Sequence, residues 1–211
     1  MAAPYTYIRD PAAIYRASQA AVEQASDLSA VPDDLRSVAI RMVHACGLPE
    51  ILADLRASPG AGAQGRAALA AGAAILADSR MVADGIIRAR LPRQNRILCL
   101  IDDPAASAAA ERGRITRSAA AVDLWRPDLA GSVVVIGNAP TALFHLLEML
   151  SRGAPKPAAI LGIPVGFVGA AESKEALAAD PSAVPYLIVR GRIGGSAMAA
   201  AAVNALARSG L

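Results

Sequence analysis

A histidine close to the end of a predicted helix is the first candidate for chemistry in this chain. Apolar side chains recur with helical spacing along residues 35–46, and Gly47 ends the pattern. His44 lies nine residues after Leu35, about 180° around the helix from this apolar stripe. Carbonyl groups at a helix C-terminus favour a protonated imidazole. His44 is therefore a candidate proton donor, with an ordinary exposed histidine as the alternative.

The other histidine and the two cysteines favour structural roles. His145 falls in the middle of an apolar helical segment, so we expect it to be packed and hydrogen-bonded. Cys46 and Cys99 lack a C-x-x-C spacing, and neither histidine stands near them in a ligand pattern. The sequence therefore predicts two small buried thiols and no metal site.

A turn from strand to helix offers a second kind of site. Residues 132–136 read as a buried strand, followed by Gly137, Asn138 and Ala139, with Pro140 at the first helical position. A helix N-terminus after a strand presents backbone N–H groups that attract anions. We therefore expect an anionic ligand at this loop, with hydrogen bonds from Asn138 and Thr141.

The loops that follow the other predicted strands should reach the same edge of the sheet, because parallel strands end together there. These loops begin at Asp78, Asp102, Gly162 and Arg190. After the strand at 158–161, the candidate ligand contacts are Gly166, for close backbone approach, and Ser173 and Lys174, at the next helix start. For Lys174, a solvated charge at an ordinary helix start is the alternative. The glycine spacing here is not the dinucleotide fingerprint, so a flavin or nucleotide protein is poorly supported.

The order of the predicted elements indicates one α/β domain over residues 1–211. Five short apolar strands, at 73–77, 96–101, 132–136, 158–161 and 186–189, alternate with helices. Two helices, from Asp10 and from about Pro32, precede them. Such alternation predicts a parallel sheet with helices on both faces. Right-handed crossovers then give a doubly wound sheet in three α/β/α layers.

Composition narrows the class of partner. The formal net charge is +3, and 19 of the 21 basic residues are arginine, whose planar fork suits carboxylates. A GC-rich genome also raises arginine and alanine together. Basic clusters without interleaved aromatic residues give little support to nucleic-acid binding. Residues 131–147 contain no charge, but the Gly-Asn-Ala-Pro break argues against a membrane span. The N-terminus lacks a secretion pattern, so we expect a cytoplasmic protein.

Three segments together resemble one known family. They are Arg-Met-Val-His-Ala-Cys-Gly at 41–47, Gly-Asn-Ala-Pro-Thr-Ala-Leu at 137–143 and Pro-Val-Gly-Phe-Val-Gly-Ala-Ala-Glu-Ser-Lys at 164–174. In this order and spacing the chain is similar to the precorrin-8X methylmutase family over nearly its whole length. The resemblance implies a flavodoxin-like fold, a homodimer, and His44 as the catalytic residue. It also implies that no cofactor is needed.

The resemblance implies an isomerase of cobalamin biosynthesis. In this family a methyl group moves between adjacent ring C carbons of precorrin-8X, a tetrapyrrole, to give hydrogenobyrinate by an intramolecular sigmatropic shift. The positions matching Ser18 and Arg117 lie around the tetrapyrrole, although alone they read as surface residues on helices. The chain looks closer to the metal-free, aerobic type than to the cobalt-dependent type. A non-catalytic carrier of the same corrinoid is the alternative.

Overall fold

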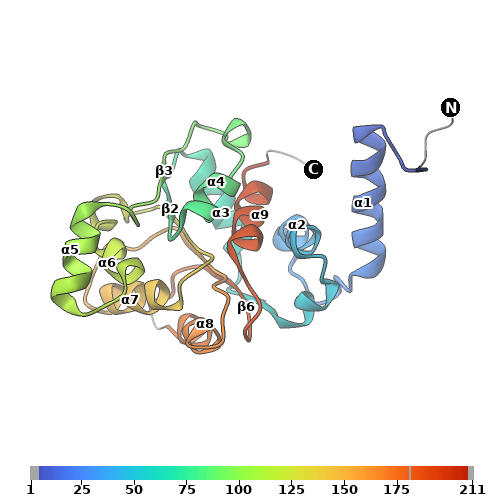
Figure 1. Ribbon diagram of the computed structural model, residues 1–211. Helices are drawn as coiled ribbons and strands as arrows, with labels where there is room; N and C mark the ends of the chain where they lie inside the picture. Colours follow the sequence, from blue (N-terminus) through green and yellow to red (C-terminus); the bar gives the residue numbers. More distant parts are fainter. Residues whose placement is uncertain (1–4, 181, 209–211) are drawn as a thin grey trace.

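A six-stranded sheet forms the centre of the computed structural model, which describes residues 5–180 and 182–208 (Figure 1). Residues 1–4, part of the segment considered for secretion, lie outside this description. The strand order is β1-β6-β5-β4-β2-β3, and every pair except β1–β6 is parallel. The strands are β1 (Leu55–Ala57), β2 (Ile75–Ala77), β3 (Ile97–Leu98), β4 (Val133–Ile136), β5 (Ala159–Gly162) and β6 (Tyr186–Val189). The five parallel strands follow the flavodoxin-like order, which confirms the predicted doubly wound fold.

The edge strand β1 corrects the expected number of strands from five to six. It pairs antiparallel with β6, with Leu55 opposite Val189 and Ala57 opposite Leu187. Its sequence is only Leu-Arg-Ala, without the β-branched or aromatic residues that mark a strand. The extended conformation of β1 therefore depends on its hydrogen bonds with β6, whose edge would otherwise be unpaired. Three residues are too few for a sequence pattern to reveal this pairing.

Helices cover both faces of the sheet, as predicted (Figure 1). On one face, strand residues such as Ile75 and Val133 pack with α2, α4 and α9. On the other, Leu76 and Val134 pack with α7 and α8, next to α6 and α5. The helices are α2 (Arg36–Cys46), α3 (Ala61–Ala70), α4 (Arg80–Gly85), α5 (Pro104–Gly113), α6 (Arg117–Asp123), α7 (Pro140–Ser151), α8 (Ala170–Ala178) and α9 (Ser196–Leu206). The alternation of adjacent strand residues between the two cores is what buried strands require.

The uncharged segment at 131–147 folds into β4 and the first part of α7. Its strand residues are completely buried between the two helical layers. In the described part of the chain, no helix combines the length and apolar character needed to cross a bilayer. The Gly-Asn-Ala-Pro break therefore separates two core elements, as the sequence predicts.

Helix α1 (Pro11–Ala25) stands at the side of the domain next to α2 (Figure 1). The predicted N-cap is confirmed, because the Asp10 carboxylate accepts a hydrogen bond from the Ala13 N–H at 2.7 Å. None of the fifteen residues of α1 is buried. Apolar side chains such as Ile14 and Tyr15 are consequently exposed. The helix borders a cavity instead of packing firmly on the core.

Candidate functional site

A cavity of about 920 Å³ lies between α1, α2 and the end of α9. Helix α2 supplies one wall through Ser37, Ile40, Arg41 and His44, which share a face at helical spacing. The opposite face of α2, including Val38 and Met42, is fully buried in the core. The volume is within the range of small-molecule sites in proteins.

His44 stands at the wall of this cavity and contacts Ser18 of α1. The Ser18 Oγ lies 2.9 Å from the His44 Nδ1. Because this contact engages Nδ1, the other ring nitrogen, Nε2, is left for a ligand. Gly47 ends α2 in a left-handed conformation, and its N–H donates to the Val43 carbonyl at 2.7 Å. The predicted position of His44, exposed and opposite the apolar stripe, is confirmed.

The cavity wall carries more positive than negative charge. Two carboxylates, Glu23 and Asp33, face four guanidinium groups, which belong to Arg36, Arg41, Arg66 and Arg208. The Arg41 Nε is buried and has no hydrogen-bond partner among the described residues. Such a wall favours a ligand with several carboxylates, because each guanidinium binds a carboxylate through two parallel hydrogen bonds.

Tyr15 and Arg208 close one side of the cavity. The Arg208 guanidinium donates a hydrogen bond to the Tyr15 hydroxyl at 2.6 Å and lies 6.0 Å from the ring centroid. This hydrogen bond lowers the pKa of the Tyr15 phenol, and the nearby charges of Arg208, Arg41 and Arg90 act in the same direction. The cationic wall therefore continues from α2 to the end of α9.

The carboxyl edge of the sheet, formed by the loops after the parallel strands, holds a second group of predicted residues. Asn138 and Arg117 are exposed there. The Thr141 Oγ1 lies 2.8 Å from the Thr116 Oγ1, so the first turns of α7 and α6 are joined directly beside Arg117. The structure thus brings Arg117, Asn138 and Thr141 to one edge, but none of them lines the cavity with His44.

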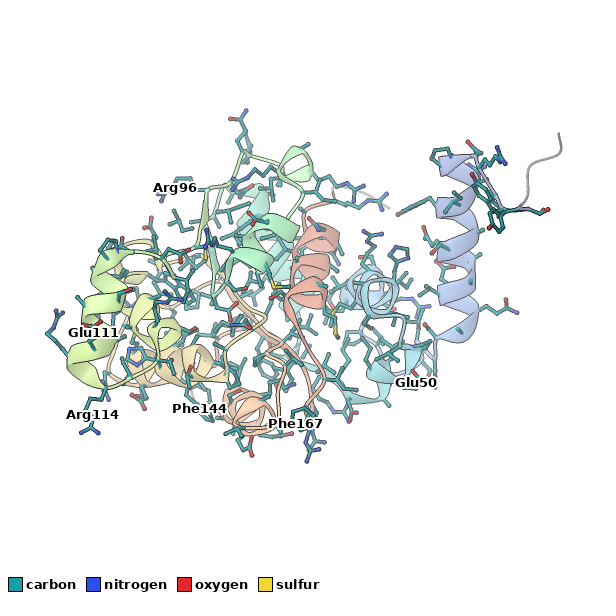
Figure 2. The ribbon with its side chains drawn as sticks, in the orientation of Figure 1. Glu50, Arg96, Glu111, Arg114, Phe144 and Phe167 are labelled. Carbon is teal, nitrogen blue, oxygen red and sulfur yellow. The ribbon has the colours of Figure 1, made fainter. Side chains whose placement is uncertain are left out.

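The loop after β5 places its predicted residues differently from one another. Gly166 is partly exposed and has φ +150°. Its neighbours Val165, Phe167 and Val168 are exposed. Figure 2 shows Phe167 at the periphery near α8. Ser173 and Lys174 are fully buried. The Ser173 hydroxyl donates to the Ala170 carbonyl at 3.2 Å, and the Lys174 Nζ donates to the Ile193 carbonyl at 2.9 Å. Burial lowers the pKa of Lys174 to about 8.

The loop at 137–139 corrects the expectation of a free anion site. The carboxylate of Asp78, at the end of β2, accepts hydrogen bonds from the N–H groups of Gly137, Asn138 and Ala139 at 2.7–3.0 Å. These donors are therefore already used within the chain. The sequence placed Asp78 on the correct edge but did not show where its side chain points.

Comparison with known proteins identifies one family over nearly the whole chain. The family model described as precorrin-8X methylmutase matches residues 13–209. A precorrin-8X methylmutase from Pseudomonas aeruginosa is 65% identical, over 95% of this chain and 97% of that protein. One from a Sinorhizobium species is 59% identical, over 98% of this chain and 99% of that protein. A crystal structure of the Thermus thermophilus precorrin-8X methylmutase matches with a TM-score of 0.85 and 39% identity, covering 93% of this chain and 94% of that chain.

The chain belongs to the precorrin-8X methylmutase family. The two relatives are named precorrin-8X methylmutase, and a methylmutase is an isomerase. The match confirms the resemblance carried by the segments at 41–47, 137–143 and 164–174. The first of these segments contributes Arg41 and His44 to the cavity, and the other two form the carboxyl edge.

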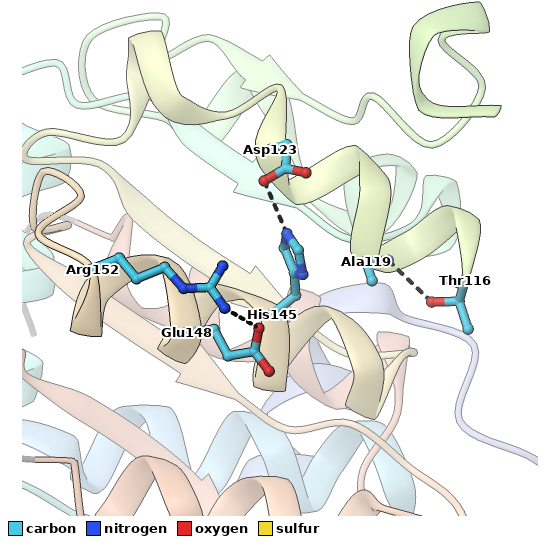
Figure 3. Close-up of polar contacts among 6 residues, drawn as sticks. All are labelled: Thr116, Ala119, Asp123, His145, Glu148 and Arg152. Carbon is cyan, nitrogen blue, oxygen red and sulfur yellow. Dashed lines mark hydrogen bonds and ion pairs between the residues drawn. The ribbon is translucent and has the colours of Figure 1, made fainter. Parts of the chain in front are cut away.

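His145 has the structural role that the sequence predicts and does not line the cavity that holds His44 (Figure 3). Its side chain is 18% exposed, and its Nε2 lies 2.9 Å from the Asp123 carboxylate on α6. One turn along α7, Glu148 pairs with Arg152 at 3.2 Å. His145 therefore joins two surface helices, and of the two histidines only His44 faces the cavity.

The sequence alone does not distinguish the cavity arginines and Tyr15 from other residues of their types. The abundance of arginine is explained equally well by base composition, which hides the few that matter. A signal was present for Arg41, which lies three residues before His44 and therefore on the same helix face. Arg66 and Arg208 reach the cavity from α3 and from the end of the chain's last helix. Only the tertiary structure brings them together.

Proposed function

We propose that this protein is a cytoplasmic isomerase of cobalamin biosynthesis that converts precorrin-8X into hydrogenobyrinate. Membership of the methylmutase family supports the reaction. One structural observation carries the assignment of the site: His44, oriented by Ser18, stands at the wall of an arginine-lined cavity of about 920 Å³. Precorrin-8X is a tetrapyrrole with acetate and propionate arms, and such a ligand needs a large site with several cations.

The arginines would bind and orient the substrate. Arg41 and Arg208 lie near Tyr15 at the cavity wall, which Arg36 and Arg66 also line. The Arg66 guanidinium donates to the Asp34 carbonyl, and the Arg36 guanidinium donates to the Leu28 carbonyl at 3.4 Å. These contacts hold the two side chains in place for carboxylate arms. A macrocycle fixed at several points is kept in a reactive shape, which itself lowers the barrier.

His44 would supply the proton that the rearrangement needs. In the protonated imidazole, Nδ1–H donates to the Ser18 hydroxyl and Nε2–H faces the substrate. Donation from Nε2 to the macrocycle increases its electron demand while the methyl group moves between adjacent carbons. The proton then returns to Nε2, so substrate and product have the same composition. General acid assistance of this kind is typically worth about 10²–10⁴-fold.

We also propose that the protein acts as a homodimer. Two observations support this: α1 buries none of its residues, and Phe167 and Val168 at the carboxyl edge are 85% and 88% exposed. A second chain would cover such surfaces and could bring Arg117 and Asn138 near a neighbouring cavity. Light scattering during size-exclusion chromatography tests this. We expect the mass of two chains at micromolar concentration, and the mass of one chain would contradict the proposal.

The metal-free substrate is the one that we assign. The two most similar relatives given above are named for precorrin-8X. A competition assay between precorrin-8X and its cobalt complex tests this choice. We expect a higher kcat/KM for the metal-free tetrapyrrole, and the reverse order would overturn the assignment.

The proposed reaction is tested by mixing the purified protein with precorrin-8X anaerobically and recording the visible spectrum. Conversion to the hydrogenobyrinate spectrum over many turnovers supports an isomerase. A changed spectrum that stays stoichiometric with protein and never turns over would instead identify a carrier. Variants that lack the Arg41 charge should bind substrate more weakly in either case, so binding alone does not distinguish the two.

A further inference from the structure

The switch point of the sheet is the place where this fold usually binds a ligand. The strand order reverses between β2 and β4, which are direct neighbours. Their carboxyl ends lead into Asp78 and into the loop at 137–139. In open α/β sheets a ligand commonly occupies the crevice between two such loops, with its anionic group on the N–H groups of the following helix.

In this protein a side chain of the chain itself fills that position. Asp78 is 3% exposed. Its Oδ1 accepts from the Gly137 N–H at 3.0 Å, and its Oδ2 accepts from the N–H groups of Asn138 at 2.9 Å and Ala139 at 2.7 Å. Burial raises the pKa of Asp78, whereas the three N–H donors act in the opposite direction. Burying a carboxylate costs free energy because the charge loses its hydration. The three backbone N–H donors compensate for that loss.

The same corner of the molecule connects three loops of the carboxyl edge. Ser79, next to Asp78, caps α4 through the Val82 N–H at 3.3 Å, and its hydroxyl lies 3.2 Å from the Ser196 hydroxyl at the start of α9. Gly137 packs so closely that a Cβ there would lie 2.9 Å from the Ser196 Cα. The conformation of the loop at 137–139 is therefore coupled to the loops after β2 and β6.

This arrangement holds a loop whose exposed side chains are candidates for contact with substrate bound in the cavity of a second chain, as in the proposed homodimer. The backbone of Asn138 is held by Asp78, while its side chain is exposed. Thr141, three residues later, contacts Thr116 beside Arg117. We propose that Asp78 is a positioning residue, whose carboxylate replaces the ligand anion at the switch point and holds Asn138 and Thr141 in place for the substrate. The positioning of Asn138 and Thr141 for the substrate rests on the proposed function, whereas the role of Asp78 as an internal anion does not.

The internal anion can be tested by chemical rescue. Asp78→Gly removes the carboxylate and leaves the three N–H donors around a space of carboxylate size. We expect the midpoint of thermal unfolding to fall, and formate to raise it again by mass action. Sodium chloride at equal ionic strength should have little effect. Asp103→Gly is the matched control, because Asp103 caps α5 through a single N–H, that of Ala105 at 2.8 Å. A formate effect no larger than the chloride effect would overturn the internal anion.

The positioning role is tested by steady-state kinetics with precorrin-8X. Asp78→Asn keeps the shape but turns a donor toward the N–H groups, so we expect KM to rise roughly tenfold with kcat changed less. Formate should lower the raised KM of Asp78→Gly. If Asp78→Gly does not fold, an unchanged KM in Asp78→Asn overturns the positioning role. Rescue of the unfolding midpoint without any change of KM likewise reduces Asp78 to a structural residue. The thermal unfolding experiment with formate requires no enzymatic turnover, so its result is valid even if the protein does not convert precorrin-8X.

Discussion

The Ser18 Oγ lies 2.9 Å from the His44 Nδ1, although the two residues are 26 positions apart. The contact joins α1, which buries none of its residues, to α2, which is anchored in the core by Val38 and Met42. The helix anchored in the core therefore carries His44, the proposed proton donor, and the exposed helix carries the hydroxyl that contacts it.

Removing the Ser18 hydroxyl should reduce turnover without abolishing it. A single hydrogen bond is worth about 1 kcal/mol, so Ser18→Ala should lower kcat by roughly fivefold to tenfold. Ser18→Thr keeps a hydroxyl and is the matched control. Steady-state assays with precorrin-8X measure the effect. A kcat equal to that of the wild type in Ser18→Ala would remove the serine from the mechanism.

Arg41 should contribute mainly to substrate binding. Its guanidinium lines the cavity, and its Nε has no partner among the described residues. Arg41→Met keeps much of the length but loses the charge, so we expect KM to rise at least tenfold, with kcat changed much less. Arg152→Met, at an exposed ion pair on α7, is the control and should leave KM unchanged. An equal KM in both variants would show that Arg41 does not bind a carboxylate arm.

Lys174 should make stability rise with pH above neutrality. Burial lowers the pKa of Lys174 to about 8, below its usual value of 10.5. Between these values the unfolded chain holds a proton that the folded chain has released, so the free energy of unfolding increases with pH. The contribution is roughly 3 kcal/mol at most.

Urea denaturation at several pH values from 7 to 10.5 measures this contribution of Lys174. Lys174→Met should remove part of the rise, because no group then titrates at that position. Lys156→Met replaces the other lysine of the chain, which is exposed and donates to the Ser182 carbonyl. Identical pH profiles for the two variants would contradict the prediction.

The sequence predicts best what depends on local periodicity. The apolar stripe of α2 predicts which face of the helix is buried. It therefore also predicts that His44 lies on the opposite face, because helical spacing alone determines both. Buried β4 and β5 were visible as apolar runs. The edge strand β1 was not, since three residues carry no pattern and its pairing with β6 is a tertiary event.

Contacts between distant segments explain what the sequence could not give. Asp78 and Gly137 are 59 residues apart, and their hydrogen bond depends on β2 and β4 being neighbours. Ser173 and Lys174 have the residue types of a binding helix start, but both are fully buried. The Ser173 hydroxyl donates to the Ala170 carbonyl in its own helix, and Lys174 donates to the Ile193 carbonyl in the loop after β6. A helix start alone does not show which of its side chains another loop will cover.

Comparing His44→Ala with His145→Ala on precorrin-8X tests whether His44 is the proton donor. We expect His44→Ala to bind the substrate with a Kd within a few-fold of the wild type but to convert it about 10²–10⁴-fold more slowly. His145→Ala, which loses only the contact with Asp123, should turn over like the wild type. Turnover is measured from the rise of the hydrogenobyrinate spectrum. Equal turnover by His44→Ala and the wild type would show that His44 is not the proton donor.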